Sequence, residues 1–95
     1  MQIGELIVST RGRDADEYFF VASVQGEYVF LVDGKIRKMA KPKRKKIKHT
    51  ASTKYIHEGL AEKFFNKSLV HDKEIFSAIR RWKEENIKEI SNVEG

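Results

Sequence analysis

The chain has 95 residues, a net charge of +5 and no cysteine, and 40% of its residues are apolar. This length allows one hydrophobic core. The lack of cysteine excludes disulfides, thiolate metal sites and thiol nucleophiles and fits a reducing cytoplasm. Even an apolar run such as residues 28–32 is too short to span a bilayer, and the N-terminus has neither the basic nor the apolar region of a secretory signal. We therefore expect a cytoplasmic protein that does not insert into a membrane.

The first half of the chain predicts short strands joined by turns. Residues 6–8 are apolar and rich in β-forming types, and the polar residues 10–17 predict a loop. Residues 18–24 are so aromatic and β-branched that we expect a strand buried on both faces. Residues 28–32 predict the next strand, after a turn at residues 25–27.

An Asp-Gly pair at residues 33–34 predicts a tight turn after this strand. Between β-rich runs such a pair is typical of a type I′ hairpin, because both central residues need positive φ. We therefore expect a hairpin into an extended segment over residues 35–39. Residues 41–46 contain no apolar side chain and are expected to contribute nothing to a core, whereas Ile47 offers one inward-pointing side chain in a last strand over residues 46–48.

The second half of the chain changes to a helical period. Apolar side chains recur at helical spacing over residues 55–66, which predicts a short amphipathic helix. A second helix is expected to begin near His71 or Asp72, where an acidic side chain is favourable at the positive end of the helix dipole, and to continue to about Glu89. We expect the last residues, 91–95, to be frayed.

Together these elements predict a mostly β fold with α content. It consists of a small SH3-like barrel of four to five strands over residues 1–54 and a C-terminal extension of two helices over residues 55–95. Such a barrel has little besides aromatic rings to fill it, so we assign Phe19, Phe20 and Phe30 to its core.

The positive charge is concentrated in one segment. Residues 1–34 contain two basic and six acidic groups, residues 35–54 contain ten basic and no acidic groups, and residues 55–95 contain seven basic and eight acidic groups. Such a segment attracts polyanions, and cations spaced along a chain bind nucleic-acid phosphates with release of counterions. We therefore expect residues 41–48, the densest part, to bind RNA.

The candidate RNA-binding residues share a side chain that can meet a phosphate, except for one loop glycine whose backbone can approach a phosphate closely. They are Arg11, Gly12, Arg13, Lys35, Arg37, Lys38, Lys41, Lys43, Arg44, Lys45, Lys46, Lys48 and His49. Contacts to phosphate read no bases, so we expect low sequence specificity.

The basic run also fits other interpretations. A solvated loop, a nuclear-localisation signal and a patch for acidic membranes all use similar residues. A membrane patch usually has an amphipathic helix or a lipid anchor beside it, whereas this run lies between predicted strands. Nucleic acid is therefore the interpretation that we prefer, with RNA ahead of duplex DNA.

No motif in the chain indicates catalysis. His49, His57 and His71 do not have the spacing of metal ligands, and we find no nucleophile elbow, phosphate-cradling glycine loop or paired-carboxylate arrangement. His49 can add a donor to phosphate, whereas the other two histidines are expected at the surface or at helix caps. We expect no enzymatic activity, no cofactor and no metal ion.

Two stretches of the first half resemble a known family. Residues 3–14 (IGELIVSTRGRD), followed by the predicted strand over residues 18–24, resemble a KOW motif, which consists of a strand, a loop around a glycine and a second strand. Residues 31–38 (LVDGKIRK) with residues 41–49 (KPKRKKIKH) resemble small bacterial KOW-domain RNA-binding proteins, relatives of the KOW-barrel ribosomal proteins of the large subunit. The resemblance covers roughly residues 1–50.

The resemblance implies an SH3-like barrel, RNA as the ligand and a role in a ribonucleoprotein, with rRNA binding or another link to the ribosome and translation. It implies that Gly12 is the loop glycine of the motif and that Arg11, Arg13 and the basic segment over residues 35–49 contact RNA. The chain departs from the motif after this loop, where three acids within residues 14–17 replace the usual lysine-glycine pair. These acids are expected to repel phosphate.

A second functional hypothesis is a protein-interaction module that binds a translation or transcription factor. Other KOW-type barrels have this role, and here the region of Trp82 and the face with Tyr18 and Tyr28 are the candidate surfaces. The two tyrosines are also candidates for a platform that stacks bases or for a cage around a methylated cation. The sequence leaves the oligomeric state open.

Overall fold

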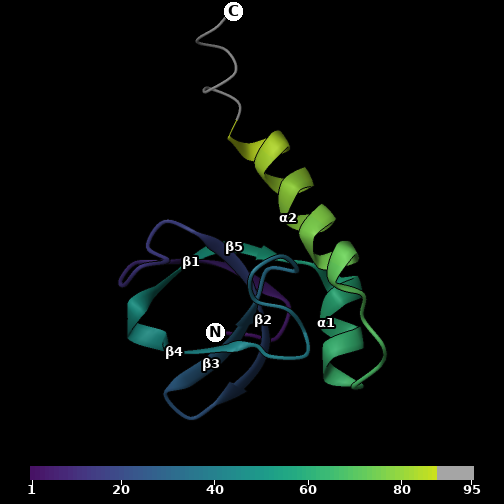
Figure 1. Ribbon diagram of the computed structural model, residues 1–95, viewed down its shortest axis with the longest axis horizontal. Coiled ribbons are helices and arrows are strands. Elements are labelled where there is room, and N and C mark those ends of the chain that lie inside the picture. The colour runs from purple at the N-terminus through teal and green to yellow at the C-terminus, as the bar shows by residue number, and fades with distance from the viewer. Residues whose placement is uncertain (88–95) are drawn as a thin grey trace, which may run out of the picture.

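The computed structural model describes residues 1–87 and shows a five-stranded antiparallel sheet followed by two helices (Figure 1). In chain order the elements are β1 (Glu5–Ser9), β2 (Tyr18–Gln25), β3 (Tyr28–Val32), β4 (Lys43–Lys46), the 3-10 helix η1 (Ile47–His49), β5 (Thr50–Ile56), α1 (Glu58–Phe65) and α2 (Asp72–Asn86). The order of the strands in the sheet is β4-β3-β2-β1-β5. The predicted mixture of a small antiparallel sheet and two C-terminal helices is therefore confirmed.

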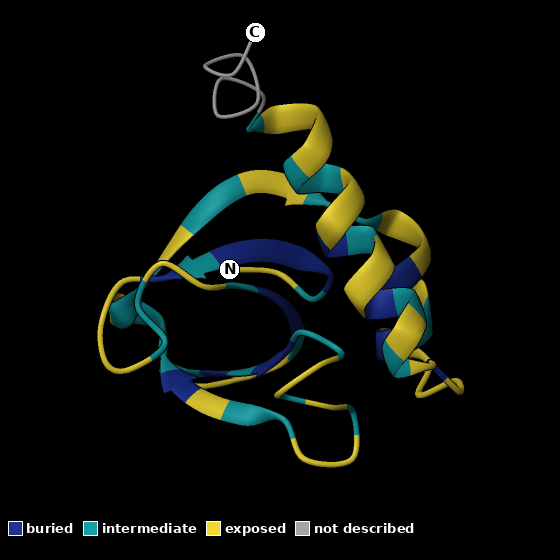
Figure 2. Ribbon diagram, turned by 45° about the horizontal axis from the view of Figure 1, so that its top comes forward, coloured by how far each residue is buried: buried dark blue, intermediate teal, exposed yellow. Residues whose placement is uncertain are grey.

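The sheet buries side chains on both of its faces, because successive side chains of a strand point to opposite sides. We call the face toward the helices the outer face and the other the inner face; Figure 2 shows the helices along one side of the curved sheet. The cluster between the outer face and the helices contains Leu6, Phe20, Val32, Leu60, Phe64, Val70, Ile75 and Ile79. The inner cluster contains Ile7, Phe19, Val21, Val29 and Leu31, with Ile47 packed against it.

Strand β2 lies at the centre of this packing. Phe19, Phe20 and Val21 are at most 2% exposed, and their side chains fall in both clusters. The predicted burial on both faces is confirmed for residues 19–21, whereas Ser23 and Val24 near the end of the strand are exposed. The assignment of Phe30 to the core is wrong: Phe30 is half-buried and belongs to neither cluster, because the helices pack mainly against β2 and not against β3.

The predicted hairpin at Asp33 and Gly34 is wrong. One carboxylate oxygen of Asp33, Oδ1, accepts the backbone N–H groups of Lys35, Ile36 and Arg37 at 2.8–3.0 Å. This side chain therefore organises a longer loop in place of a two-residue turn, as Asx motifs do. Gly34 has φ +78°, and a Cβ there would collide with the backbone at the start of α2, so the loop lies directly against that helix.

Strand β4 forms within the run that the sequence predicted to contribute nothing to a core. Residues 43–46 pair with β3 along their whole length, from Leu31 opposite Lys43 to Tyr28 opposite Lys46. The predicted last strand over residues 46–48 is also wrong, because the chain turns there through η1. This 3-10 helix connects β4 to β5, the strand at the opposite edge of the sheet.

The predicted helix over residues 55–66 begins too early. Tyr55 and Ile56 still belong to β5, which pairs with β1, and α1 begins only at Glu58. His57 caps the helix, since its Nδ1 accepts the N–H of Leu60 at 3.1 Å. The expectation of a cap or surface position for His57 is therefore confirmed.

Helix α2 begins at Asp72, as predicted. The side chain of Asp72 also accepts the N–H of Met39 at 2.8 Å, which attaches the loop before β4 to the helix. The helix ends at Asn86, with Ile87 as its C-cap, so the predicted continuation to about Glu89 is too long. The predicted frayed end over residues 91–95 lies outside the described residues. Within residues 1–87 none of the helices has the length and apolar character needed to cross a membrane.

Candidate nucleic-acid interface

Strand β4 divides the basic run between the two faces of the sheet. Lys43 and Lys45 lie opposite Leu31 and Val29, whose side chains belong to the inner cluster. Residues directly opposite each other in an antiparallel pair share a face. These two lysines therefore point to the inner side of the sheet, and the alternate residues of β4 point to the outer side.

Lys45 is only 8% exposed. Its Nζ donates to Oδ1 of Asp14 at 2.6 Å, to the hydroxyl of Ser9 at 2.6 Å and to the carbonyl oxygen of Arg11 at 2.7 Å. A lysine ammonium has three N–H donors, and all three are used. Lys45 thus holds the β1–β2 loop against β4. This corrects the sequence-based assignment, because a buried ammonium with no free donor is not available to a phosphate.

Asp14 balances the charge of this cluster. Burial alone would raise the pKa of its carboxyl group, but hydrogen bonds from Lys45 and Ser9 and the charges of Lys45 and Lys43 outweigh burial and hold the pKa at about 2, below its ordinary value of 3.8. The Nζ of Lys43 lies 3.4 Å from Oδ2 of Asp14. Asp14 is therefore a paired carboxylate, and its expected repulsion of phosphate is largely cancelled by its partners.

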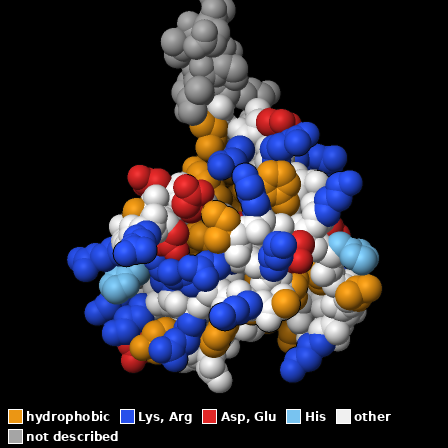
Figure 3. All heavy atoms as spheres, in the orientation of Figure 1, with side chains coloured by type: hydrophobic (Ala, Val, Ile, Leu, Met, Phe, Trp, Pro, Cys, Tyr) orange, Lys and Arg blue, Asp and Glu red, His pale blue; other side chains and the backbone are white. Residues whose placement is uncertain are grey.

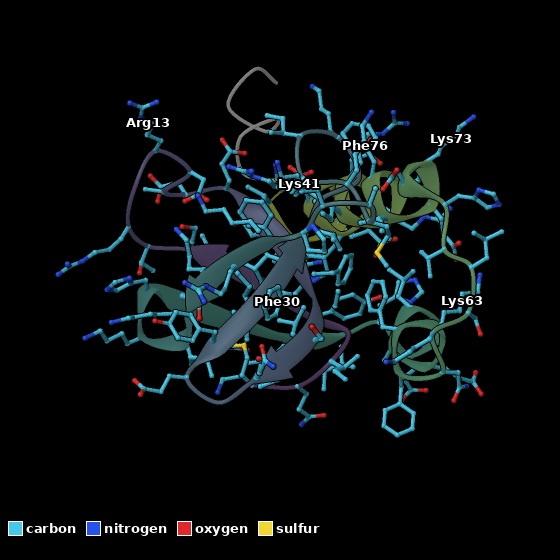
Figure 4. All side chains as sticks on the ribbon, turned by 60° about the horizontal axis from the view of Figure 1, so that its bottom comes forward. Arg13, Phe30, Lys41, Lys63, Lys73 and Phe76 are labelled. Carbon is cyan, nitrogen blue, oxygen red and sulfur yellow. The ribbon has the colours of Figure 1, made fainter. Side chains whose placement is uncertain are left out.

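Gly12 lies in the loop above this ion pair. Its φ is +89°, a conformation that residues with a side chain rarely adopt, and a Cβ at this position would lie 3.7 Å from Nζ of Lys45. The glycine therefore lets the loop turn over the buried ammonium. The flanking Arg11 and Arg13 are exposed, and Figure 4 shows Arg13 extending outward from the loop.

The outer side of β3 and β4 combines aromatic rings with cations. Phe30 lies opposite Arg44, and Tyr28 lies opposite Lys46. The guanidinium carbon of Arg44 is 4.4 Å from the centre of the Tyr28 ring, which is a close cation–π contact. The role of Tyr28 was open from the sequence alone. Its alternation with buried Val29 is the signal that places it on the outer face. We call Tyr28, Phe30 and Arg44 the aromatic face.

The 3-10 helix brings further cations to the end of this surface. Thr10 donates its N–H to the carbonyl oxygen of His49 at 2.9 Å, so η1 lies beside the β1–β2 loop. Figure 3 shows lysine and arginine side chains crowding this side of the molecule. We call this region the cationic rim, which consists of Arg11, Lys46, Lys48 and His49.

The pKa of His49 reports on the rim. Partial burial lowers the pKa of His49 below its ordinary value of 6.5, and the positive charges of Arg11, Lys48, Lys46 and Lys45 lower it further. The contribution of these four positive charges, as distinct from that of burial, indicates that His49 lies in a positive field. The rim therefore has the electrostatic character of an anion site.

The loop over residues 33–42 holds the remaining candidates, and the structure spreads them out. Arg37 lines a hollow of about 350 Å³ together with Arg13 and Lys43. Lys38 and Lys41 are exposed. Lys35 instead lies toward the helices, with its Nζ 5.8 Å from the ring centre of Phe76 in α2. The structure therefore does not unite all thirteen predicted residues in one site.

A second aromatic group lies between β5 and α2. The ring of Trp82 is centred 5.5 Å from that of Tyr18 and 6.5 Å from that of Tyr55, and Nζ of Lys83 lies 5.0 Å from the Tyr18 ring centre. Trp82, Tyr55 and His57 line a hollow of about 440 Å³. Trp82, whose region the sequence offered as a candidate surface for a protein partner, is half-buried, because it packs against the cluster on the outer face of the sheet.

Within residues 1–87 no group of three or more His, Cys, Asp or Glu side chains is arranged to hold a metal ion. No protein-family model matches the chain, and no curated protein matches it. The features that define the candidate site are thus the cationic rim and the aromatic face beside it.

Proposed function

We propose that this protein is a non-catalytic, cytoplasmic RNA-binding protein that contacts RNA phosphates through its cationic rim. The observation that carries the proposal is the sorting of charge by β4. The inner lysines neutralise Asp14 and order the β1–β2 loop, whereas Lys46, Lys48 and Arg11 remain on one side of the molecule. Several cations held close together displace the counterions that are condensed on a nucleic-acid phosphate chain, and the release of these counterions favours binding.

We also propose that the sheet forms an SH3-like barrel and that the protein is a relative of the KOW family. Two edge strands joined by a short 3-10 helix support an SH3-like barrel. The positive φ of Gly12, in a loop between the first two strands, supports the resemblance to a KOW motif. A ribonucleoprotein role in translation, with ribosomal RNA as the ligand, rests on that resemblance alone.

A protein-interaction module is the second candidate function. The hollow lined by Tyr55, His57 and Trp82 favours it, as does the exposure of Phe65 and Leu69, which are 73% and 78% exposed. Exposed apolar side chains and hollows lined by aromatic rings are each typical of protein contacts. These features lie on the helical side of the molecule and do not overlap with the cationic rim.

The test is RNA binding by the purified chain, measured by fluorescence anisotropy over a series of salt concentrations. We expect log K to fall linearly with log salt, with a slope of roughly −0.7 to −0.9 per neutralised phosphate. Lys48→Ala should lower the affinity and flatten the slope. Lys73→Ala removes the same charge from α2, on the helical side shown in Figure 4, and should change neither.

Absence of RNA binding at low salt, or an affinity that does not depend on salt, would overturn the proposal. Recovery of a protein partner after nuclease treatment, together with either result, would favour the interaction module. Co-sedimentation with ribosomal subunits tests the link to translation separately.

A further inference from the structure

The aromatic face is a surface that the core of the protein does not require. The inner cluster is filled by Val29 and Leu31, which are fully buried. Tyr28 and Phe30 alternate with them and therefore project to the outer side of β3. Both are half-buried, because the helices pack mainly against β2.

Cations and polar groups surround these two rings. The Arg44 guanidinium lies over the Tyr28 ring, and Lys46 is the cross-strand neighbour of the same tyrosine. On the other side, Ser23 and Gln25 of β2 lie opposite Phe30 and Tyr28 and are exposed. A surface of aromatic rings and a guanidinium, with hydroxyl and amide groups at its border, offers stacking together with hydrogen bonding.

The aromatic face is continuous with the cationic rim. Ile47 donates its N–H to the carbonyl oxygen of Glu27 at 2.8 Å, which holds η1 beside the β2–β3 turn. Lys48 and His49 therefore follow directly after the end of the face that carries Tyr28. A ligand that lies on the rings can extend its charged part onto the rim without a gap.

Single-stranded nucleic acid matches this combination. Its phosphates need cations, and its unpaired bases have free π-faces that stack on tyrosine, phenylalanine and arginine. In a duplex the bases are already stacked on one another, so the rings would have nothing to contact. An acidic peptide would use the cations but would leave the stacking surface unexplained.

We propose that Tyr28, Phe30 and Arg44 form a stacking platform for unpaired bases of RNA whose phosphates bind at Lys46 and Lys48. This inference rests on the proposed function and goes beyond it. Binding through phosphates alone would not distinguish single strands from duplexes, whereas a stacking platform gives the protein a preference for single-stranded RNA segments. It also gives the protein a non-electrostatic contribution to affinity that salt does not screen.

The experiment compares Tyr28→Ala and Tyr28→Phe with the unchanged protein, using labelled oligouridine and an RNA duplex of equal phosphate number. Tyr28→Ala should weaken oligouridine binding by about tenfold or more at every salt concentration, with an unchanged salt slope, because one stacked base is lost. Tyr28→Phe keeps the ring and should bind nearly as the unchanged protein does. Duplex binding should be weaker than oligouridine binding and insensitive to both substitutions.

Photocrosslinking provides a readout that needs no variant. Oligouridine with 5-iodouridine should crosslink to Tyr28 or Phe30 in the unchanged protein. Salt-dependent RNA binding with crosslinks elsewhere and full affinity in Tyr28→Ala would overturn the stacking platform and leave the proposed function standing. Failure of both RNAs to bind would overturn both.

Discussion

The ammonium of Lys45 and the carboxylate of Asp14 form an ion pair of 2.6 Å across 31 positions of the chain. The pair attaches β4 to the loop between β1 and β2, and Ser9 hydrogen-bonds to both partners. A buried ion pair adds little net stability compared with apolar residues, but loss of one partner leaves an uncompensated charge. The densest cluster of positive charge in the chain therefore includes a residue whose function is to position the loop that carries Arg11.

Lys45→Met should destabilise the protein, whereas Lys46→Met should not. The first substitution leaves the partly buried Asp14 without its closest partner and should cost about 3 kcal/mol. The second removes the same charge from the outer side of β4 and should change stability by about 0.5 kcal/mol or less. Urea unfolding followed by circular dichroism measures both. Equal losses in the two variants would show that Lys45 has no special structural role.

The pKa of Asp14 predicts a loss of stability in acid. The folded protein holds this pKa at about 2, below the ordinary value of 3.8. Because the unfolded chain binds the proton more readily, the contribution of Asp14 is fully present above pH 3.8 and is lost as the pH falls toward 2. Unfolding free energies measured across this range should fall more steeply for the unchanged protein than for Asp14→Asn. Parallel curves would contradict the assignment.

Gly34→Ala should destabilise the protein more than Gly26→Ala. Both glycines have positive φ, +78° and +61°, so both substitutions strain the backbone by about 1 kcal/mol. Only at Gly34 would the new Cβ also collide with the backbone of α2 at Asp72, whereas a Cβ at Gly26 would meet no neighbouring atom within 4 Å. We expect an additional loss of about 2 kcal/mol at Gly34. The difference between their thermal midpoints measures how tightly the loop packs against the helix.

The parts of the fold that the sequence predicts well are those with a local side-chain signal. The aromatic and β-branched residues 18–24 predicted β2, and the acidic start at Asp72 predicted α2. Strand β4 has no such signal, since backbone pairing with β3 holds it and none of its residues is apolar. At Asp33 the local signal was misleading, because its carboxylate caps three backbone N–H groups of a loop.

The candidate site was predictable as a region but not residue by residue. The charge count identified the segment that supplies Lys46 and Lys48. The burial of Lys45 depends on Asp14, far away in the chain, and no local pattern carries that information. The outer position of Tyr28 follows from alternation, but all five residues of β3 are apolar or aromatic, so the sequence does not show which of them face the core.

The lowered pKa of His49 predicts that RNA binds more tightly in mild acid. In the free protein, partial burial and then the neighbouring cations hold this pKa below 6.5. Protonation therefore disfavours the folded state, and stability falls as the pH drops through 6.5. A phosphate bound at the rim reverses the local field and raises the pKa of His49 in the complex. Binding must then take up a proton, and affinity must rise as the pH falls.

The size of this effect follows from linkage. Affinity should rise by up to about tenfold for each unit by which the pKa of His49 in the complex exceeds that in the free protein. His49→Gln keeps a hydrogen-bond donor but cannot titrate, and it retains His57 and His71 as internal controls. Anisotropy titrations above and below pH 6.5, at constant salt, compare the two proteins. The affinity of His49→Gln could instead change with pH as much as that of the unchanged protein. In that case the phosphates do not bind next to His49, and the cationic rim is not the phosphate-binding site.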